Sequence, residues 1–356
     1  MSFRQAALSW RLALAGGAVA ALLSGQGAAA QASFHGKSII MLVGSEPGGG
    51  TDASGRVLAP FLSKYLPGEP KVIVQDMPGA NGITALNYLF RRTQPDGLTV
   101  LMGSITTLDP MAFRLSGVQY DPQSLGFVGG IGRGGSVIFV RRSAEPRLHD
   151  KSAPPVLIGS ALAIPRVAMQ PALWCITYLG WNASWVTGYR GTNEIMLAFD
   201  RGEVDMTSTA NIFDIKDRLD SGELTIVNQT GSIENGKIVG RPEFGDAPLF
   251  PVQMQGKITD PIAQKAFEYW KAFDAGDKWL ALPPDTPADV LAAYREAFRK
   301  LSLDPEFRRE GEAISDGFAP MAAPDVSAVV RTLVETPDEA IAYTKRLMRE
   351  QGIKVQ

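Results

Sequence analysis

The sequence predicts an α/β protein of two domains, and three observations lead to this prediction. The chain has 356 residues, and at about 150 residues per domain this length suggests two domains. Apolar runs of strand length alternate with stretches that carry apolar residues at helical spacing, which is typical of a layered fold with a largely parallel sheet. A glycine-rich segment near residue 130 interrupts this alternation, which then starts again.

Residues 1–32 are predicted to form a cleavable signal peptide. Arg4 and Arg11 precede an apolar stretch that is too short for a membrane span, which needs about 20 residues. The A-x-A rule allows cleavage after Ala30 or after Ala32, and the second site is preferred. We therefore expect a soluble mature protein in the periplasm, with an uncleaved N-terminal anchor as the alternative.

The first half repeats a simple order of strand, loop and helix. Thr51 or Asp52 is the expected N-cap of the first helix, because its side-chain oxygen can accept a backbone N–H of the first turn. The pattern predicts strands at 37–43, 71–75 and 98–102, a glycine-rich loop at 44–52, a turn at 78–82, and helices up to Tyr65 and at 83–90.

Two apolar strands within residues 127–142 are separated by five glycines at 129–135. Glycine tolerates backbone conformations that other residues avoid, so we interpret this segment as a crossover between domains. A hairpin with a glycine-rich turn is the alternative.

A second α/β pattern follows the glycines. It predicts strands at 155–160, 184–186, 203–206, 224–228 and 278–282, and helices at 169–179, 193–200, 260–275, 287–301 behind the cap Thr286, and twice within 325–352. The helical C-terminal quarter is expected to pack on the first domain. We expect domain I to comprise 33–133 and 246–356, and domain II to comprise 134–245.

The composition argues against several classes of protein. Lys and Arg number 35 against 37 Asp and Glu, a formal charge of -2, and the basic residues form no run longer than a pair, which disfavours a nucleic-acid-binding protein. With only His35, His149 and Cys175 as histidine and cysteine, one chain cannot assemble a Cys/His zinc site or an internal disulfide. We expect neither a metal nor a cofactor.

The glycine-rich loops suggest a site for a small anion. Gly48–Gly50 has neither the Lys-Ser/Thr of a P-loop nor the spacing of a dinucleotide fold. It does lead into a helix N-terminus, whose backbone N–H groups and partial positive charge suit a carboxylate. Loops at 79–82, 103–104 and 159–160 also follow predicted strands, where open α/β sheets bind ligands. Together they favour an anion cleft between the domains.

Several motifs follow one another in a characteristic order: Pro-Gly-Gly-Gly-Thr-Asp at 47–52, Met-Pro-Gly-Ala-Asn-Gly at 77–82, Pro-Asp-Gly-Leu-Thr-Val-Leu at 95–101, Tyr-Arg-Gly-Thr at 189–192, Gly-Glu-Val-Asp at 202–205 and Pro-Asp-Thr-Pro-Ala-Asp-Val at 284–290. This set resembles the Bug family, the periplasmic solute-binding receptors of tripartite tricarboxylate transporters. The resemblance covers nearly all of the mature chain. It implies a type II periplasmic-binding-protein fold, in which two α/β domains joined by two crossovers close on a carboxylated solute.

The resemblance also implies which residues contact the solute. In such receptors, amides and hydroxyls of the first glycine-rich loop and of a second-domain loop hold the carboxylate. The residues carried over are Gly49, Gly50, Thr51 and Asp52 in the first loop, Ser104 after the third strand, Ser160 in the second-domain loop, and Tyr189 and Asp205 on the far wall.

One segment departs from the family pattern. The second-domain loop usually continues into Pro-Ser-His, whereas this chain reads Gly-Ser-Ala-Leu-Ala-Ile-Pro-Arg at 159–166. We hypothesise that Arg166 grips a carboxylate through charge-assisted, bidentate hydrogen bonds. A solvated arginine at a helix start is the alternative.

The expected function is that of a receptor without chemistry, a monomer that delivers a small carboxylate to membrane permease subunits. Closure would bend the chain at about 129–135 and 224–230. A sensory receptor that signals to a two-component kinase is one alternative. An exported enzyme that uses Asp52 and Asp205 as acid and base is another. The solute remains open, and the tryptophans of the second domain are expected to pack in the core.

Overall fold

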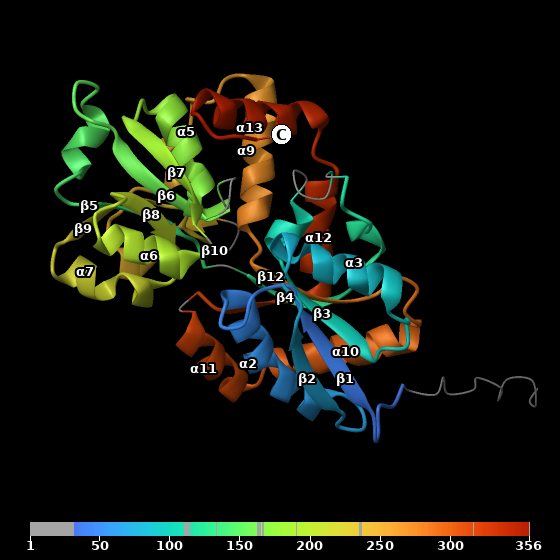
Figure 1. The fold of residues 1–356 in the computed structure, drawn as a ribbon. Helices are drawn as coiled ribbons and strands as arrows, with labels where there is room; N and C mark the ends of the chain where they lie inside the picture. The colour runs from blue at the N-terminus through green and yellow to red at the C-terminus, as the bar shows by residue number, and fades with distance from the viewer. Residues whose placement is uncertain are drawn as a thin grey trace, which may run out of the picture.

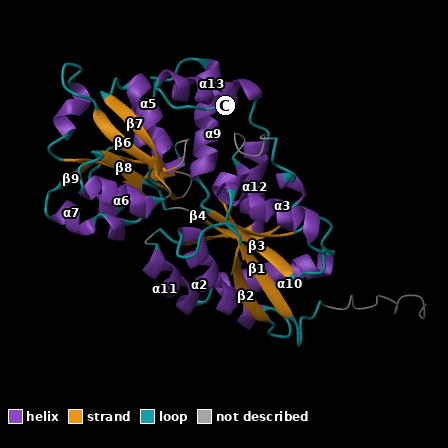
Figure 2. Cartoon of the chain, in the orientation of Figure 1, coloured by secondary structure: helices purple, strands orange, loops and turns teal. Residues whose placement is uncertain are grey.

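The computed structural model describes residues 32–109, 114, 116–132, 134–161, 165, 167–189, 191–234, 237–315 and 317–355. Within these residues the chain forms two lobes, each built on its own β-sheet with helices on both faces (Figures 1 and 2). Arg166 lies outside the described residues, as do residues 1–31 of the predicted signal peptide.

The first lobe contains a six-stranded sheet of order β13-β4-β12-β3-β1-β2. β1 is parallel to β2 and β3, and β12 is antiparallel to β3 and β4, so β1 to β4 all point in one direction. The strands are β1(Ser38–Val43), β2(Lys71–Asp76), β3(Thr99–Ser104), β4(Gly126–Gly132), β12(Lys278–Leu282) and β13(Ala319–Ala322).

Five helices cover the two faces of this sheet. α2(Gly50–Tyr65), α10(Ala288–Ser302) and α11(Pro305–Ile314) share one buried hydrophobic cluster with β1, while α3(Ile83–Arg92) and α12(Ala323–Val334) contribute to the cluster on the opposite face. α2 lies close to the sheet at Gly55, where an added Cβ would be 3.1 Å from Val43. The helix therefore runs back across the sheet from its carboxyl edge.

The second lobe contains a five-stranded sheet of order β7-β6-β8-β5-β9. β6 is parallel to β7 and β8, and β5 is antiparallel to β8 and β9. The elements are β5(Val137–Arg141), β6(Val156–Ala161), β7(Ala183–Tyr189), β8(Met206–Thr209), β9(Leu224–Gln229), α5(Gln170–Tyr178), α6(Thr192–Asp200) and α7(Lys216–Asp220), with a separate hairpin of β10(Ser232–Glu234) and β11(Lys237–Val239).

The glycine-rich segment is a crossover, as predicted, because β4 belongs to the first sheet and β5 to the second. The chain returns after β9 through α8(Phe250–Gln253) and α9(Pro261–Asp274) to β12. The two connections lie side by side: Gly135 has a φ of 93°, and an added Cβ there would be 2.4 Å from the carbonyl oxygen of Gly231. Only glycine fits such an approach without strain. The exact domain boundaries remain predictions.

The last helix, α13(Asp338–Glu350), packs mainly on α9 and also on α5 of the second lobe. α9 lies within the range expected for domain I, 246–356, and the division into domains stays a prediction. The side-chain amide of Gln351 donates to the carbonyl of Leu173 at 2.8 Å, and the hydroxyls of Tyr178 and Tyr343 are 2.5 Å apart. Trp174 lies in this aromatic contact, so its predicted core role is confirmed.

Candidate ligand site

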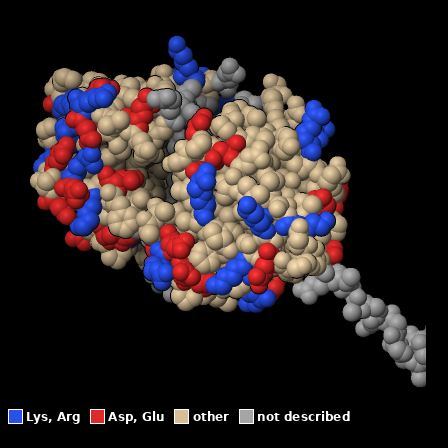
Figure 3. Space-filling view, turned by 60° about the horizontal axis from the view of Figure 1, so that its bottom comes forward, with Lys and Arg blue, Asp and Glu red and all other residues tan. Residues whose placement is uncertain are grey.

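The carboxyl edges of both sheets face the crossovers and therefore each other. In the first lobe, Ile131 near the end of β4 is paired with Lys278, which is also paired with Ser104 at the end of β3. In the second lobe, Val137 at the start of β5 is paired with Thr209 at the end of β8. Figure 3 shows the surface hollowed between the two lobes. A ligand of an open α/β sheet binds at such an edge.

The first-lobe loop is braced by Asp52. Its Oδ2 accepts the N–H of Gly48 at 2.7 Å, and its Oδ1 lies 2.7 Å from Nε of Arg56. Burial raises the pKa of Asp52, but the hydrogen bonds from Arg56 and Gly48 outweigh it and hold this pKa below its usual value. The carboxylate is thus charged, 3% exposed and engaged within the loop. Its position fits the bracing of the loop better than contact with an anion.

The helix cap differs from the prediction. The N-cap of α2 is Gly49, and neither Thr51 nor Asp52 takes that position. Gly49 has no side chain that could accept a hydrogen bond from the first turn of α2. The backbone N–H groups of Gly50 and Thr51 therefore lie at a helix start without an acceptor from the cap residue. They are the groups that the carboxyl edge offers to an anion.

Ser104 is held at the same edge by its backbone. Its carbonyl accepts the indole N–H of Trp279 at 3.0 Å and the hydroxyl of Thr107 at 2.7 Å. Its own hydroxyl accepts that of Thr106 at 3.1 Å. The backbone at Ser104 is therefore fixed, while its hydroxyl stays at the edge as a polar group.

Lys278 was not expected from the sequence. It is paired directly with Ser104 in the sheet register, its side chain is 10% exposed, and its Nζ lies 2.6 Å from Oδ1 of Asp277. A lysine at the first position of a predicted strand was the only signal in the sequence. Its neighbour across the strands could not be read from the sequence, because it lies far away in the chain.

In the second lobe, Ser160 and Tyr189 stand near the carboxyl edge. Ser160 is fully buried in β6, and Tyr189 ends β7 opposite Ala161. Burial raises the pKa of Tyr189, and the nearby charges of Glu203 and Glu194 raise it further. The phenol therefore stays protonated and can donate a hydrogen bond.

Asp205 lies at the other end of this sheet. The strand begins one residue after it, at Met206, rather than at residue 203 as expected. Its carboxylate is 2.7 Å from Nη2 of Arg147 and accepts the N–H of Leu157, near the start of β6, at 3.0 Å. These contacts put Asp205 at the amino edge, so we leave it out of the candidate site. They also do not bring it together with Asp52.

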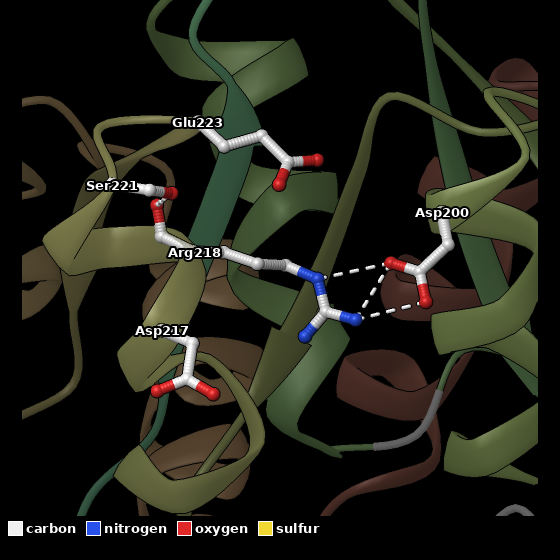
Figure 4. Close-up of a pocket in the computed structure, with 5 residues that line it drawn as sticks. All are labelled: Asp200, Asp217, Arg218, Ser221 and Glu223. Atoms are coloured by element: carbon white, nitrogen blue, oxygen red, sulfur yellow. Dashed lines mark hydrogen bonds and ion pairs between the residues drawn. The ribbon is translucent and has the colours of Figure 1, made fainter.

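A hollow on the outer side of the second lobe is also unsuited to an anion (Figure 4). Arg218 points at Asp200 and bonds both of its carboxylate oxygens, at 2.7 and 2.8 Å. Asp217 and Glu223 add negative charge to the same lining. Asp200 ends α6 and Glu223 precedes β9, so this hollow lies at the amino edge of the sheet.

Arg241 joins the segments that connect the lobes, and the sequence did not single it out. The residue is 4% exposed, and its Nη1 donates to the carbonyls of Gly135 and Ala210, each at 2.9 Å. Its backbone N–H donates to Oε1 of Gln229 at 2.7 Å. One guanidinium thus links the crossover to the loop after β8.

Among the described residues, none of the helices combines the length and the apolar character that a membrane span requires. Over the same residues, no group of three or more His, Cys, Asp or Glu side chains is placed to hold a metal ion.

Two α/β lobes joined by crossovers, with their carboxyl edges facing, define a bilobal α/β fold in which a ligand can be enclosed between the lobes. The structure is similar to the periplasmic binding protein BugD, at a TM-score of 0.61 and 20% identity over 90% of this chain and 99% of that one. It is also similar to MatC of Rhodopseudomonas palustris with bound malate, at 0.58 and 17% over 87% and 98%, and to an R. palustris protein with adipate, at 0.62 and 18% over 89% and 98%.

These likenesses confirm the predicted fold and the resemblance to the Bug proteins at the level of the fold. No family model matches the sequence. No curated protein matches it either.

Proposed function

We propose that the protein is a periplasmic receptor of the Bug type that binds a small carboxylate between its lobes. The observation that carries the proposal is the start of α2, where uncapped backbone N–H groups lie at the carboxyl edge that faces the second lobe. Partial positive charge at a helix N-terminus favours a carboxylate. The malate and adipate named for two proteins of the same fold support this solute class.

The proposed site joins both lobes. Its first-lobe contacts are the backbone of the loop at Gly49–Thr51 and the hydroxyl of Ser104, and its second-lobe contact is Tyr189. Ser160 and Arg166 remain part of the proposal. A solute that touches both edges stabilises the closed arrangement, since a ligand shifts an equilibrium by its preference for one state.

Delivery to a transporter completes the proposal. A signal peptide at 1–32 exports the chain, closure presents both lobes to membrane permease subunits of the tripartite tricarboxylate type, and no chemistry takes place. The two carboxylates of the enzyme alternative have other partners, since Asp52 pairs with Arg56 and Asp205 with Arg147.

A thermal-shift screen tests the binding step. The exported protein is heated with mono-, di- and tricarboxylates, including malate and adipate, and with aromatic and amino acids. A solute that binds only the folded state at one hundred times its Kd adds about 2.7 kcal/mol of stability, so the melting temperature rises. The matched controls are the amides of the same acids, which carry no charge. No rise with any carboxylate would contradict the proposal, and solute turnover would favour the enzyme alternative.

A further inference from the structure

Lys278 is a largely buried cation at the edge where the proposed site lies. It starts β12, and the register pairs it with Ser104 on one side and with Ile131 on the other. Residues directly opposite each other in an antiparallel pair project to the same face of the sheet. The side chains of Lys278 and Ser104 therefore project from the same face of the sheet, at the same edge.

That face is the one that α2 covers. Two positions further into the sheet, Leu280 is paired with Met102, and both belong to the hydrophobic cluster that contains α2. An added Cβ on Gly55 of α2 would contact the side chain of Met102 at 3.9 Å. The first turn of α2 lies further toward the carboxyl edge. The helix start, Ser104 and Lys278 thus converge from three segments of the chain.

One partner of Lys278, Asp277, is held in place through its backbone. Asp277 donates its N–H to the carbonyl of Ile131 at 3.0 Å, and its own carbonyl accepts the N–H of Ile105 at 2.8 Å. The carboxylate of Asp277 is 25% exposed, against 10% for the lysine side chain. An ammonium carries three donors, so it can bond Asp277 and an arriving carboxylate together.

We propose that Lys278 is a specificity-determining residue, whose ammonium pairs with a solute carboxylate beside Ser104. This inference rests on the proposed carboxylate-binding function and deepens it. The start of α2 supplies only partial positive charges, whereas the ammonium of Lys278 supplies a full positive charge. Its side chain is 10% exposed, so water screens this charge only weakly. A charged acid should then be strongly preferred over its neutral amide.

The test pairs one variant with a matched control. Lys278→Met is compared with Lys271→Met, because Lys271 also pairs with an acid, Glu268, at 2.7 Å but lies on the surface of α9. Calorimetry gives Kd for malate, for adipate and for the diamide of each. We expect Lys278→Met to weaken binding of the acids roughly tenfold and to narrow the preference for acid over amide. Lys271→Met should change neither.

The partner residue gives a second readout of opposite sign. Asp277→Asn removes a negative charge next to the solute carboxylate, so it should tighten binding of the acids a few-fold. If the ion pair is only structural, both variants lower the melting temperature and leave the preference for acid over amide unchanged. That result would overturn the role of Lys278 while the proposed function stands. If the unmodified protein binds no carboxylate at all, both proposals fail.

Discussion

Asp52 and Asp205 offer a direct comparison between the two lobes. Both are carboxylates expected at the cleft, and both are ion-paired with an arginine, at 2.7 Å in each case. Asp52 follows a strand and lies in the first turn of α2, at the carboxyl edge. Asp205 precedes its strand and contacts Leu157 at the amino edge.

Whether an aspartate lies at the cleft depends on which end of its strand it occupies, and not on its being an aspartate. A shift of three residues in the start of β8 moves Asp205 from within the strand to the residue before it. At the amino edge of the second sheet, the carboxylate of Asp205 then bonds Arg147 and the N–H of Leu157. In the first lobe the same chemistry organises the loop that faces the cleft, through the N–H of Gly48.

The largest expected effect comes from removing a tryptophan that supports the first-lobe edge. Trp279→Ala should cost about 3–5 kcal/mol of unfolding free energy because it empties a buried site. It should also weaken carboxylate binding, since the indole holds the carbonyl of Ser104. Urea unfolding and calorimetry measure the two effects.

The matched control is Trp174→Ala in the contact between α5, α9 and α13. Trp174 is equally buried, at 1% exposed, but lies away from Ser104. The control should lose a similar amount of stability and keep its affinity for carboxylates. Equal losses of affinity in both variants would remove the special role of the first-lobe edge.

A smaller difference is expected between Asp52→Ala and Asp205→Ala. The first should cost about 2 kcal/mol, because the N–H of Gly48 and the guanidinium of Arg56 lose a partner whose side chain is only 4% exposed. The second should cost about 1 kcal/mol, because the Asp205 carboxylate is 15% exposed and therefore less costly to remove. Hydrogen exchange should quicken in the loop 44–50 only in Asp52→Ala. Unchanged exchange in that loop would show that Asp52 does not brace it.

The smallest effect is a pH dependence specific to the first lobe. Asp304 accepts hydrogen bonds from Lys64 and Tyr65, each at 2.8 Å, and these bonds lower its pKa to about 2. Its pKa in the unfolded chain is about 3.9, so its stabilising contribution is complete above that pH. The contribution should be lost as the pH falls from about 4 to about 2.

Urea midpoints between pH 2 and pH 5 measure this effect. The control is Asp304→Asn, in which that part of the acid sensitivity should disappear. The prediction is wrong if both proteins lose stability equally over this range.

Much of the fold could be predicted because the signals are local. The strand at Lys278–Leu282 matches the predicted range, and α9 differs from it by one residue at each end. α11 and β13 were missed, although Asp304 caps α11 by accepting the N–H of Glu306 at 2.9 Å. α11 has only a few apolar residues and β13 is only four residues long, so neither gives a clear period.

The candidate site was only partly predictable. Gly49–Thr51 and Ser104 follow strands, and the rule that ligands bind at carboxyl edges was enough to single them out. Lys278 could not be found in this way, because it begins its strand, and β12 brings it to the carboxyl edge only by running antiparallel to β3. The packing of α13 depends on an aromatic contact among α5, α9 and α13, in which Trp174 lies against Phe267 and Tyr343. These three helices are far apart in the sequence.

The sequence by itself determined the order of strands and helices and the crossover between two sheets. Apolar periodicity and glycine conformation act over a few residues, so they can be read along the chain. Only the tertiary structure decided that Lys278 lies beside Ser104, that Asp205 lies at the far edge and that α13 packs on α9 and α5. These outcomes depend on strand register and on packing between distant segments, and neither leaves a local pattern.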